Sequence, residues 1–334
     1  VAVLLVDAAR GVRPQTHRHL TVCALMGVQT IIVAVNKMDL VNFSHEVFEE
    51  VMSEVRTTAA RLGVEQIYGI PVSAVTGANI TTKSDDMPWF KGESLLGALA
   101  VWEPVGRVAN EGFRFPVQFI IRAEGNFRGY AGTVVAGSVR PGDEVMVTDS
   151  GNSARVDRIV TSDGDLQEAK YGQAVTLTLD HEVDITRGDI LASGTSLQPA
   201  DRFGVDLVWL GEEPLAHGRS YLLISGSRSV PATVTSVRHR LDVVSGHEHA
   251  ARVLNMNDIG RVEIATDRPI PMDPYVQCRD TGGFLLVDRV SADTVAAGLS
   301  RHAMRRAFNL VPHDYEVDHQ ARSALMGHPA RVVW

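Results

Sequence analysis

The chain has 334 residues, of which 45% are hydrophobic and 22% charged, and its formal net charge is −8. That length allows two or three domains, each with its own hydrophobic core. The negative charge argues against a nucleic-acid partner, and no apolar run approaches the roughly 18 residues of a membrane span. Cys23 and Cys278 fit no metal spacing and no disulfide framework, so we expect a reducing compartment, the cytoplasm.

The first 106 residues alternate between apolar runs and helical periodicity. Apolar runs at 1–6, 30–35 and 66–72 predict buried parallel strands. Helices are expected over 16–26, over 44–62 with Ser44 as the N-cap, and over 94–102. This alternation predicts an α/β domain at 1–106 with a parallel sheet.

After residue 106 the pattern changes to short alternating runs separated by glycine turns. These runs extend from Phe113 to Leu191 and again from Phe203 to about Val290, and the stretch "DIGRVE" is read as a loop leading into a strand. They predict two consecutive all-β barrels, at 107–201 and 202–298. The remainder, 299–334, is polar with a helix expected over 318–325. Because the chain opens on a core strand and closes on the apolar run "ARVVW", we interpret both ends as cuts through larger domains.

The stretch "IIVAVNKMDLV" carries the clearest chemistry, because a buried strand delivers Asn36, Lys37, Met38 and Asp39 to a loop. At the carboxyl end of a parallel strand, where α/β sheets bind ligands, the Asp39 carboxylate can accept from N1–H and the exocyclic amine of guanine. Adenine offers no such pair of donors, and an unpaired buried polar group rejects the wrong ligand by roughly 10⁴–10⁵. Asn36 can tie the loop to its neighbours, and the aliphatic stem of Lys37 can lie over the base.

A second loop, "PVSAVTG", follows the third strand and supplies Ser73 and Ala74. The Ser73 hydroxyl can brace the first loop, and the Ala74 amide can donate to guanine O6. A lone N-K-x-D also occurs by chance as a polar strand-to-helix turn. No G-x-x-x-x-G-K-[ST] loop occurs anywhere in the chain, so the pattern predicts only the guanine half of a nucleotide site.

Longer stretches resemble a known family. The run "LLVDAARGVRPQTHRHLTVCALMGVQTIIVAVNKMDLV" is similar to translation-factor GTPases, the group of elongation factor Tu. The narrower resemblance is to the GTPase subunit of bacterial sulfate adenylyltransferase, and it covers about residues 1–298. It is carried by stretches that include "MPWFKGESLL", "FRGYAGTVVAGSVRPGDEV", "GRSYLLISGSRSVPATVTSVRHRLDV" and "DTGGFLLVDR".

The resemblance implies a partial P-loop GTPase α/β domain followed by two elongation-factor-like β-barrels, truncated at both ends. It implies GTP as the cofactor, with Asn36, Lys37, Met38, Asp39, Ser73 and Ala74 as guanine-binding residues and Mg²⁺ only in the intact protein. The implied function is to couple GTP hydrolysis to the formation of adenylylsulfate from ATP and sulfate, a nucleotidyltransferase reaction. The implied partner is the smaller catalytic subunit, with no nucleic acid and no membrane, and no catalytic residue carries over to this chain.

The tail "RSALMGHPARVVW" resembles the start of an adenylylsulfate kinase domain, so 299–334 is interpreted as a linker and the first strand of a fused kinase. The fragment itself is expected to be inactive. The alternative for the tail is a C-terminal extension specific to this protein, with an apolar end that docks on the barrels. For the chain, the alternatives are an elongation-factor-type GTPase that delivers aminoacyl-tRNA and a non-catalytic partner-binding fragment.

Other polar residues receive structural interpretations. His17 and His19 are two positions apart, so they face different sides of a helix and are expected at the surface, with no metal. Arg128 and Gly129 are expected in a turn between barrel strands.

Overall fold

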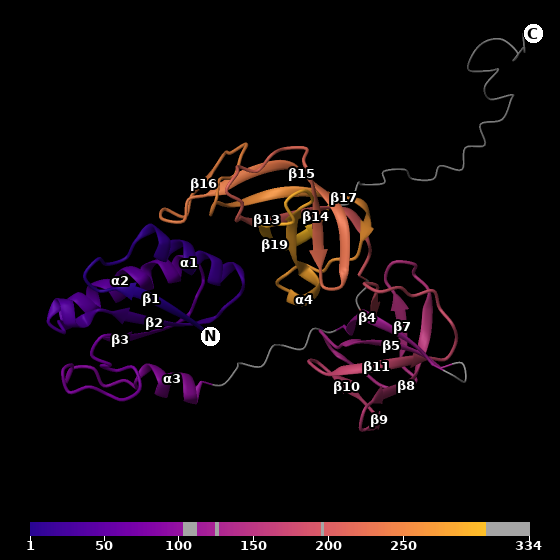
Figure 1. Cartoon of the computed structure of the whole chain (residues 1–334), viewed down its shortest axis with the longest axis horizontal. Helices are drawn as coiled ribbons and strands as arrows, with labels where there is room; N and C mark the ends of the chain where they lie inside the picture. The colour runs from indigo at the N-terminus through magenta and orange to yellow at the C-terminus, as the bar shows by residue number, and fades with distance from the viewer. Residues whose placement is uncertain (103–111, 124–126, 195–196, 305–334) are drawn as a thin grey trace, which may run out of the picture. The chain divides into compact units, whose positions relative to one another are not determined.

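The computed structural model describes residues 1–102, 112–123, 127–194 and 197–304 (Figure 1). The helix and the final strand expected within 299–334 lie beyond Met304, outside the described residues. The first described range is an α/β unit built on a three-stranded parallel sheet in the order β1-β2-β3. Its elements are β1 (Ala2–Asp7), α1 (Pro14–Leu25), β2 (Thr30–Asn36), η1 (Met38–Val41), α2 (His45–Arg61), β3 (Gln66–Pro71) and α3 (Leu95–Val101).

Strand β2 is buried on both faces, as its unbroken apolar sequence predicts. One face packs with α1 and α2, through a cluster that includes Val33, Leu20 and Phe48. The opposite face packs with α3, through a smaller cluster around Ile32 with Leu95 beside it. Figure 1 shows α1 and α2 on one side of this sheet and α3 on the other. The polar residues that follow β2 are therefore attached to a rigid base.

The limits of α2 follow from local chemistry. The Ser44 hydroxyl accepts a hydrogen bond from the Val47 amide at 3.3 Å, which satisfies one of the free amides of the first turn. The helix ends at Arg61, with Leu62 as its C-cap, and Gly63 follows at φ +72°, a conformation that glycine adopts without strain. The helix predicted from Ser44 to Leu62 is confirmed.

The first barrel closes into a ring in which β11, β5, β4, β12, β7 and β8 pair in turn and β8 pairs back to β11. Its core includes Phe115, Tyr130 and Leu177. Arg128 and Gly129 lie inside β5, where they pair with β4, so the expectation of a turn there is wrong. The strands are β4 (Arg114–Ala123), β5 (Phe127–Thr133), β6 (Ser138–Val139), β7 (Glu144–Val147), β8 (Ser153–Thr161), β9 (Gly164–Leu166), β10 (Ala169–Lys170), β11 (Ala174–Leu179) and β12 (Ile190–Ala192).

The second barrel closes in the same way through β14, β18, β19, β13, β17 and β15, which pairs back to β14. The stretch "DIGRVE" leads into β17, as predicted. Strand β13 begins at Ala200 and β19 ends at Ala303, so this barrel extends beyond the expected range 202–298 at both ends. Its elements are β13 (Ala200–Trp209), β14 (Ser220–Ser225), β15 (Arg228–Leu241), β16 (Glu248–His249), β17 (Ile259–Ile270), α4 (Arg279–Gly282), β18 (Gly283–Asp288) and β19 (Thr294–Ala303).

Two buried arginines connect the barrels. Arg228, at the start of β15, donates to both carboxylate oxygens of Asp149 at 2.6 Å and to the Gly188 carbonyl. Arg114, at the start of β4, donates to Asp273 at 3.1 Å, and both side chains are buried. Within the described ranges, no helix is long and apolar enough to cross a membrane.

Candidate functional site

The predicted site residues lie at one edge of the α/β sheet. Strands β1, β2 and β3 are parallel, with Asp7 opposite Asn36 and Val35 opposite Pro71, so all three end at the same edge. Asn36 closes β2, and the loop with Ser73 and Ala74 follows β3. This is the edge at which open α/β sheets bind ligands.

The two loops are joined by the Asn36 side chain. Its Oδ1 atom accepts from the Lys37 amide at 2.7 Å and from the Ala74 amide at 3.0 Å. The expected role of Asn36 in tying the loops together agrees with this geometry. The Ala74 amide, however, already has a partner, so a hydrogen bond from it to guanine O6 requires that the amide be shared or exchanged.

A second hydrogen bond between the two loops orients the Asp39 carboxylate. The Ser73 hydroxyl donates to Asp39 Oδ1 at 2.5 Å, and the Ser73 side chain is fully buried. Within the described residues, Asp39 Oδ2 accepts no hydrogen bond from protein. The carboxylate is therefore held in place by one oxygen and presents the other to a donor.

Met38 has a different place from the one expected. Its side chain is fully buried in the core cluster, and its amide donates to the Val72 carbonyl at 3.2 Å. Met38 fixes the loop to the sheet, and its side chain cannot contact a base. The preceding residue, Lys37, has a left-handed backbone at φ 66° and ψ 34°, which lets the chain turn sharply between β2 and η1.

Asp7 is a site residue that the sequence interpretation missed. Its Oδ2 atom lies 2.7 Å from the Lys37 ammonium, and its Oδ1 atom accepts from the Ala9 amide at 3.0 Å. The hydrogen bond from Lys37 is the main cause that lowers the pKa of Asp7 below its ordinary value of 3.8, so the carboxylate is charged at neutral pH. The sequence places Asp7 at the end of a predicted strand, and the structure shows that this strand lies beside the one that ends at Asn36.

The arrangement as a whole is suited to the edge of a planar base. One oxygen of the partly buried Asp39 carboxylate is oriented by Ser73, the two loops are joined to each other, and Lys37 is exposed beside them. Among the described residues, no cluster of His, Cys, Asp or Glu could hold a metal ion. This edge of the sheet therefore offers hydrogen-bonding groups suited to a planar base.

Three family models match the chain in sequence order. They are the elongation factor Tu GTP-binding domain at 1–106, elongation factor Tu domain 2 at 130–192, and the eEF1A C-terminal domain-like family at 202–300. The chain is 43% identical over 305 residues to "Sulfate adenylyltransferase subunit 1" of Laribacter hongkongensis, covering 91% of this chain and 63% of that protein. It is 45% identical over 337 residues to "Bifunctional enzyme NodQ" of Azospirillum brasilense, covering 100% of this chain and 54% of that protein.

Over about nine-tenths of its length, the chain is thus similar to proteins named sulfate adenylyltransferase subunit 1. It is also 40% identical to "Bifunctional enzyme CysN/CysC" of Xylella fastidiosa, of which it covers 54%. The chain thus spans about half the length of the bifunctional relatives that it matches.

A solved structure confirms the fold class. The structure of sup35 complexed with GDP matches with a TM-score of 0.55 and 23% identity, over 91% of this chain and 78% of that one. The expected combination of an elongation-factor-type α/β domain with two β-barrels is confirmed.

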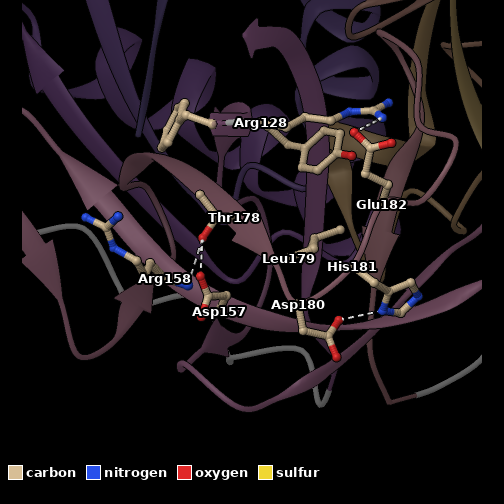
Figure 2. A pocket seen from close by; sticks show the side chains of 10 residues that line it. Arg128, Asp157, Arg158, Thr178, Leu179, Asp180, His181 and Glu182 are labelled. Carbon is tan, nitrogen blue, oxygen red and sulfur yellow. Dashed lines mark hydrogen bonds and ion pairs between the residues drawn. The ribbon is translucent and has the colours of Figure 1, made fainter. Parts of the chain in front are cut away.

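The first barrel has a polar cavity of about 270 Å³ (Figure 2). Most of the charges around it are paired with each other: Arg128 with Glu182 at 3.4 Å, and Asp180 with His181 at 2.7 Å. Arg128 also lies over the Tyr130 ring, 5.6 Å from its centroid. Because these charges largely neutralise one another, we assign no ligand to the cavity, although Arg128 Nε is buried without a hydrogen-bond partner.

His17 corrects a second expectation. The residue was expected at the surface, but it is only 7% exposed, because α1 packs against α2 there. Its Nδ1 atom lies 3.1 Å from the Thr58 hydroxyl of α2, and Nε2 lies 3.5 Å from Glu54. His17 therefore fills the helix interface, and His19 remains on the outer side, within hydrogen-bond distance of Gln15.

Proposed function

We propose that this chain is the guanine-recognising part of the GTP-binding subunit of a sulfate adenylyltransferase. The observation that carries the proposal is the pair of loops joined by Asn36 and Ser73, with the Asp39 carboxylate oriented between them, in a chain similar to sulfate adenylyltransferase subunit 1. In the whole protein, GTP hydrolysis would drive the formation of adenylylsulfate and pyrophosphate from ATP and sulfate.

Base selection follows from the donors and acceptors. Asp39 would accept from N1–H and the exocyclic amine of guanine, and the Lys37 stem would cover one face of the ring. Adenine lacks both donors on that edge, so it would leave the oriented carboxylate unpaired, a penalty of about 1–3 kcal/mol or more. The residues Asn36, Lys37, Asp39, Ser73 and Ala74 are assigned to guanine binding in this proposal, with Met38 as their anchor.

GTP hydrolysis and adenylyl transfer are not assigned to residues of this chain. This sequence has no G-x-x-x-x-G-K-[ST] loop, and the described residues offer no ligand set for Mg²⁺, so no hydrolytic step is derived from them. The adenylyl transfer is assigned to a smaller catalytic partner subunit, and the location to the cytoplasm, where free cysteines such as Cys23 and Cys278 stay reduced.

We also propose the domain division and the fused kinase. The proposed division is the α/β unit followed by the two barrels, and an adenylylsulfate kinase is proposed to follow them. The bifunctional relatives that align along the full chain support it. Reading the gene beyond the codon for Trp334 tests the kinase: a second G-x-x-x-x-G-K-[ST] codon run is expected, and its absence would refute the idea.

The guanine assignment is tested by changing the acceptor. Asp39→Asn replaces one acceptor oxygen with a donor amide, which suits the carbonyl at C2 of xanthine instead of the amine of guanine. We expect the variant to lose at least tenfold in guanosine affinity and to gain xanthosine binding, measured by amide chemical-shift titration of the full chain. If guanosine and adenosine bind the unaltered chain equally, the proposal fails.

Two other functions remain to be distinguished from this one. An elongation-factor-type GTPase would copurify with tRNA, whereas the proposed subunit would not. A purely partner-binding fragment would show no preference between guanosine and adenosine.

A further inference from the structure

Asp7 and Lys37 form an ion pair that no part of the base-recognition scheme above uses. Lys37 is otherwise an exposed side chain on a flexible four-carbon stem, and such a stem samples many rotamers when its ammonium is free. The pair has a separation of 2.7 Å and connects the end of β1 with the loop after β2. The direction of the Lys37 stem is therefore fixed by a residue 30 positions earlier in the chain.

The carboxylate of Asp7 is itself held in place. Oδ1 accepts from the Ala9 amide in the turn after β1, and the Ala8 amide donates to the Asn36 carbonyl at 2.8 Å. Asp7 is only 22% exposed, whereas Lys37 is 47% exposed. The anchored partner is thus the carboxylate, and the lysine is the side chain that it restrains.

We propose that Asp7 is a positioning residue for guanine binding: it holds the ammonium of Lys37 so that the lysine stem forms a preset wall for one face of the base. This rests on the proposed guanine site. A lysine stem that is already ordered loses less conformational entropy when the base binds, so the restraint raises the affinity for the base. The restrained Lys37 stem contacts the face of the base and not its edge. It therefore does not distinguish guanine from hypoxanthine, which differ only by an amine on the edge.

A purely structural role makes a different prediction. If the pair only stabilised the turn after β1, its loss would lower the stability of the α/β unit and leave base affinity unchanged in the folded protein. A double-mutant cycle separates the two roles, because an effect of Asp7 that acts through Lys37 disappears when Lys37 is already replaced.

The experiment uses the full chain and four proteins: unaltered, Asp7→Asn, Lys37→Met and the double variant. Guanosine, inosine and adenosine are titrated, and binding is followed by amide and lysine ε-carbon shifts. The chain has only four lysines, Lys37, Lys83, Lys91 and Lys170, so each lysine signal can be assigned by single replacement. Glu93→Gln is the control, because it removes the exposed Lys83–Glu93 pair, at 3.0 Å, away from the site.

We expect Asp7→Asn to weaken guanosine and inosine binding equally, by about two- to fivefold, as suits a partly exposed ion pair. The same change should have no further effect on the Lys37→Met background, and Glu93→Gln should bind like the unaltered chain. Equal affinity of Asp7→Asn and the unaltered chain overturns the positioning role and leaves the guanine site intact. Persistence of the effect on the Lys37→Met background also overturns it.

Failure of the proposed function has a separate signature: the unaltered chain then shows no preference for guanosine over adenosine, and both ideas fall. Should Asp7→Asn lose its fold, Asp7→Glu replaces it, because this longer carboxylate keeps the charge and moves it. The positioning role then requires weaker guanosine binding in Asp7→Glu with its native amide spectrum retained, and unchanged binding refutes it.

Discussion

Single residues decide how the candidate site is built. Lys37 adopts a left-handed backbone, which is uncommon for a residue other than glycine and often marks a functional turn. Ser73 has no solvent exposure and directs its hydroxyl at Asp39, so a small buried side chain orients a larger, partly buried one. Lys37 thus turns the chain after β2, and Ser73 fixes the orientation of Asp39.

The charge of Asp7 gives a pH prediction at this scale. Its folded-state pKa lies below the ordinary 3.8, so its ion pair contributes stability above that pH and loses it as the pH falls through the folded-state pKa. In Lys37→Met the main cause of the lowering is removed, and we expect the titration midpoint of Asp7 to rise, as followed by carboxyl carbon shifts. Arg10→Gln is the control, because Arg10 contributes least to the lowering; an unchanged midpoint in Lys37→Met would contradict the assignment.

At the scale of elements, helix α2 is limited by its own sequence. The Ser44 hydroxyl accepts from the Val47 amide and donates to Glu46 at 2.7 Å. One face of the helix enters the core, with Val51, Met52 and Val55 nearly or fully buried. Local capping and tertiary burial therefore agree on the same helix.

Replacement of the cap tests that reasoning. Ser44→Ala removes the acceptor for the Val47 amide and should destabilise α2 by about 1 kcal/mol. The measurement is amide hydrogen exchange in the first turn of the helix, where protection should fall. Ser53→Ala is the matched control on the exposed side of the same helix, and alanine is the better helix former there, so protection should hold or rise. Equal behaviour of the two variants would show that Ser44 does not act as a cap.

The elements were more predictable from the sequence than the contacts between them. The periodicity of 44–62 and the apolar run before Asn36 specify α2 and β2, because both signals are local. The burial of His17 depends on Thr58, which lies 41 positions away, and the pairing of Asp7 with Lys37 depends on which strands are neighbours. Arg128 was misplaced in a turn because Arg-Gly is also turn chemistry, and only the register with β4 shows that it lies within a strand.

At the scale of the whole molecule, buried charges join parts that are far apart in the sequence. Arg228 and Asp149 are 79 positions apart and Arg114 and Asp273 are 159 apart, and neither arginine could be assigned a partner from the sequence. Arg228 also donates to the carbonyl of the buried Gly188, so its removal would leave that carbonyl without this donor. The Asp149 side chain is 28% exposed and can turn to water, so the main cost is the unsatisfied buried acceptor.

We therefore expect Arg228→Met to destabilise the barrels by about 1–3 kcal/mol. The measurement is thermal unfolding followed by both circular dichroism and tryptophan fluorescence, with a lower midpoint expected. Arg238→Gln serves for comparison, because Arg238 pairs with Glu263 at the surface with 60% of its side chain exposed and should change stability by less than about 1 kcal/mol. A comparable loss in both variants would show that Arg228 does not depend on its burial.

The hydrogen bonds that join the two loops of the candidate site also affect the expected kinetics of base binding. Because Asn36 and Ser73 already connect the loops, only the hydrogen bond from Ala74 to Asn36 has to be shared or exchanged when a base arrives. The association rate should then be limited by diffusion and orientation, and it should be similar for any purine of the same size. Discrimination would appear in the residence time, since affinity differences at one site arise mainly from dissociation rates. The wrong base would enter as readily as the right one, and it would leave sooner.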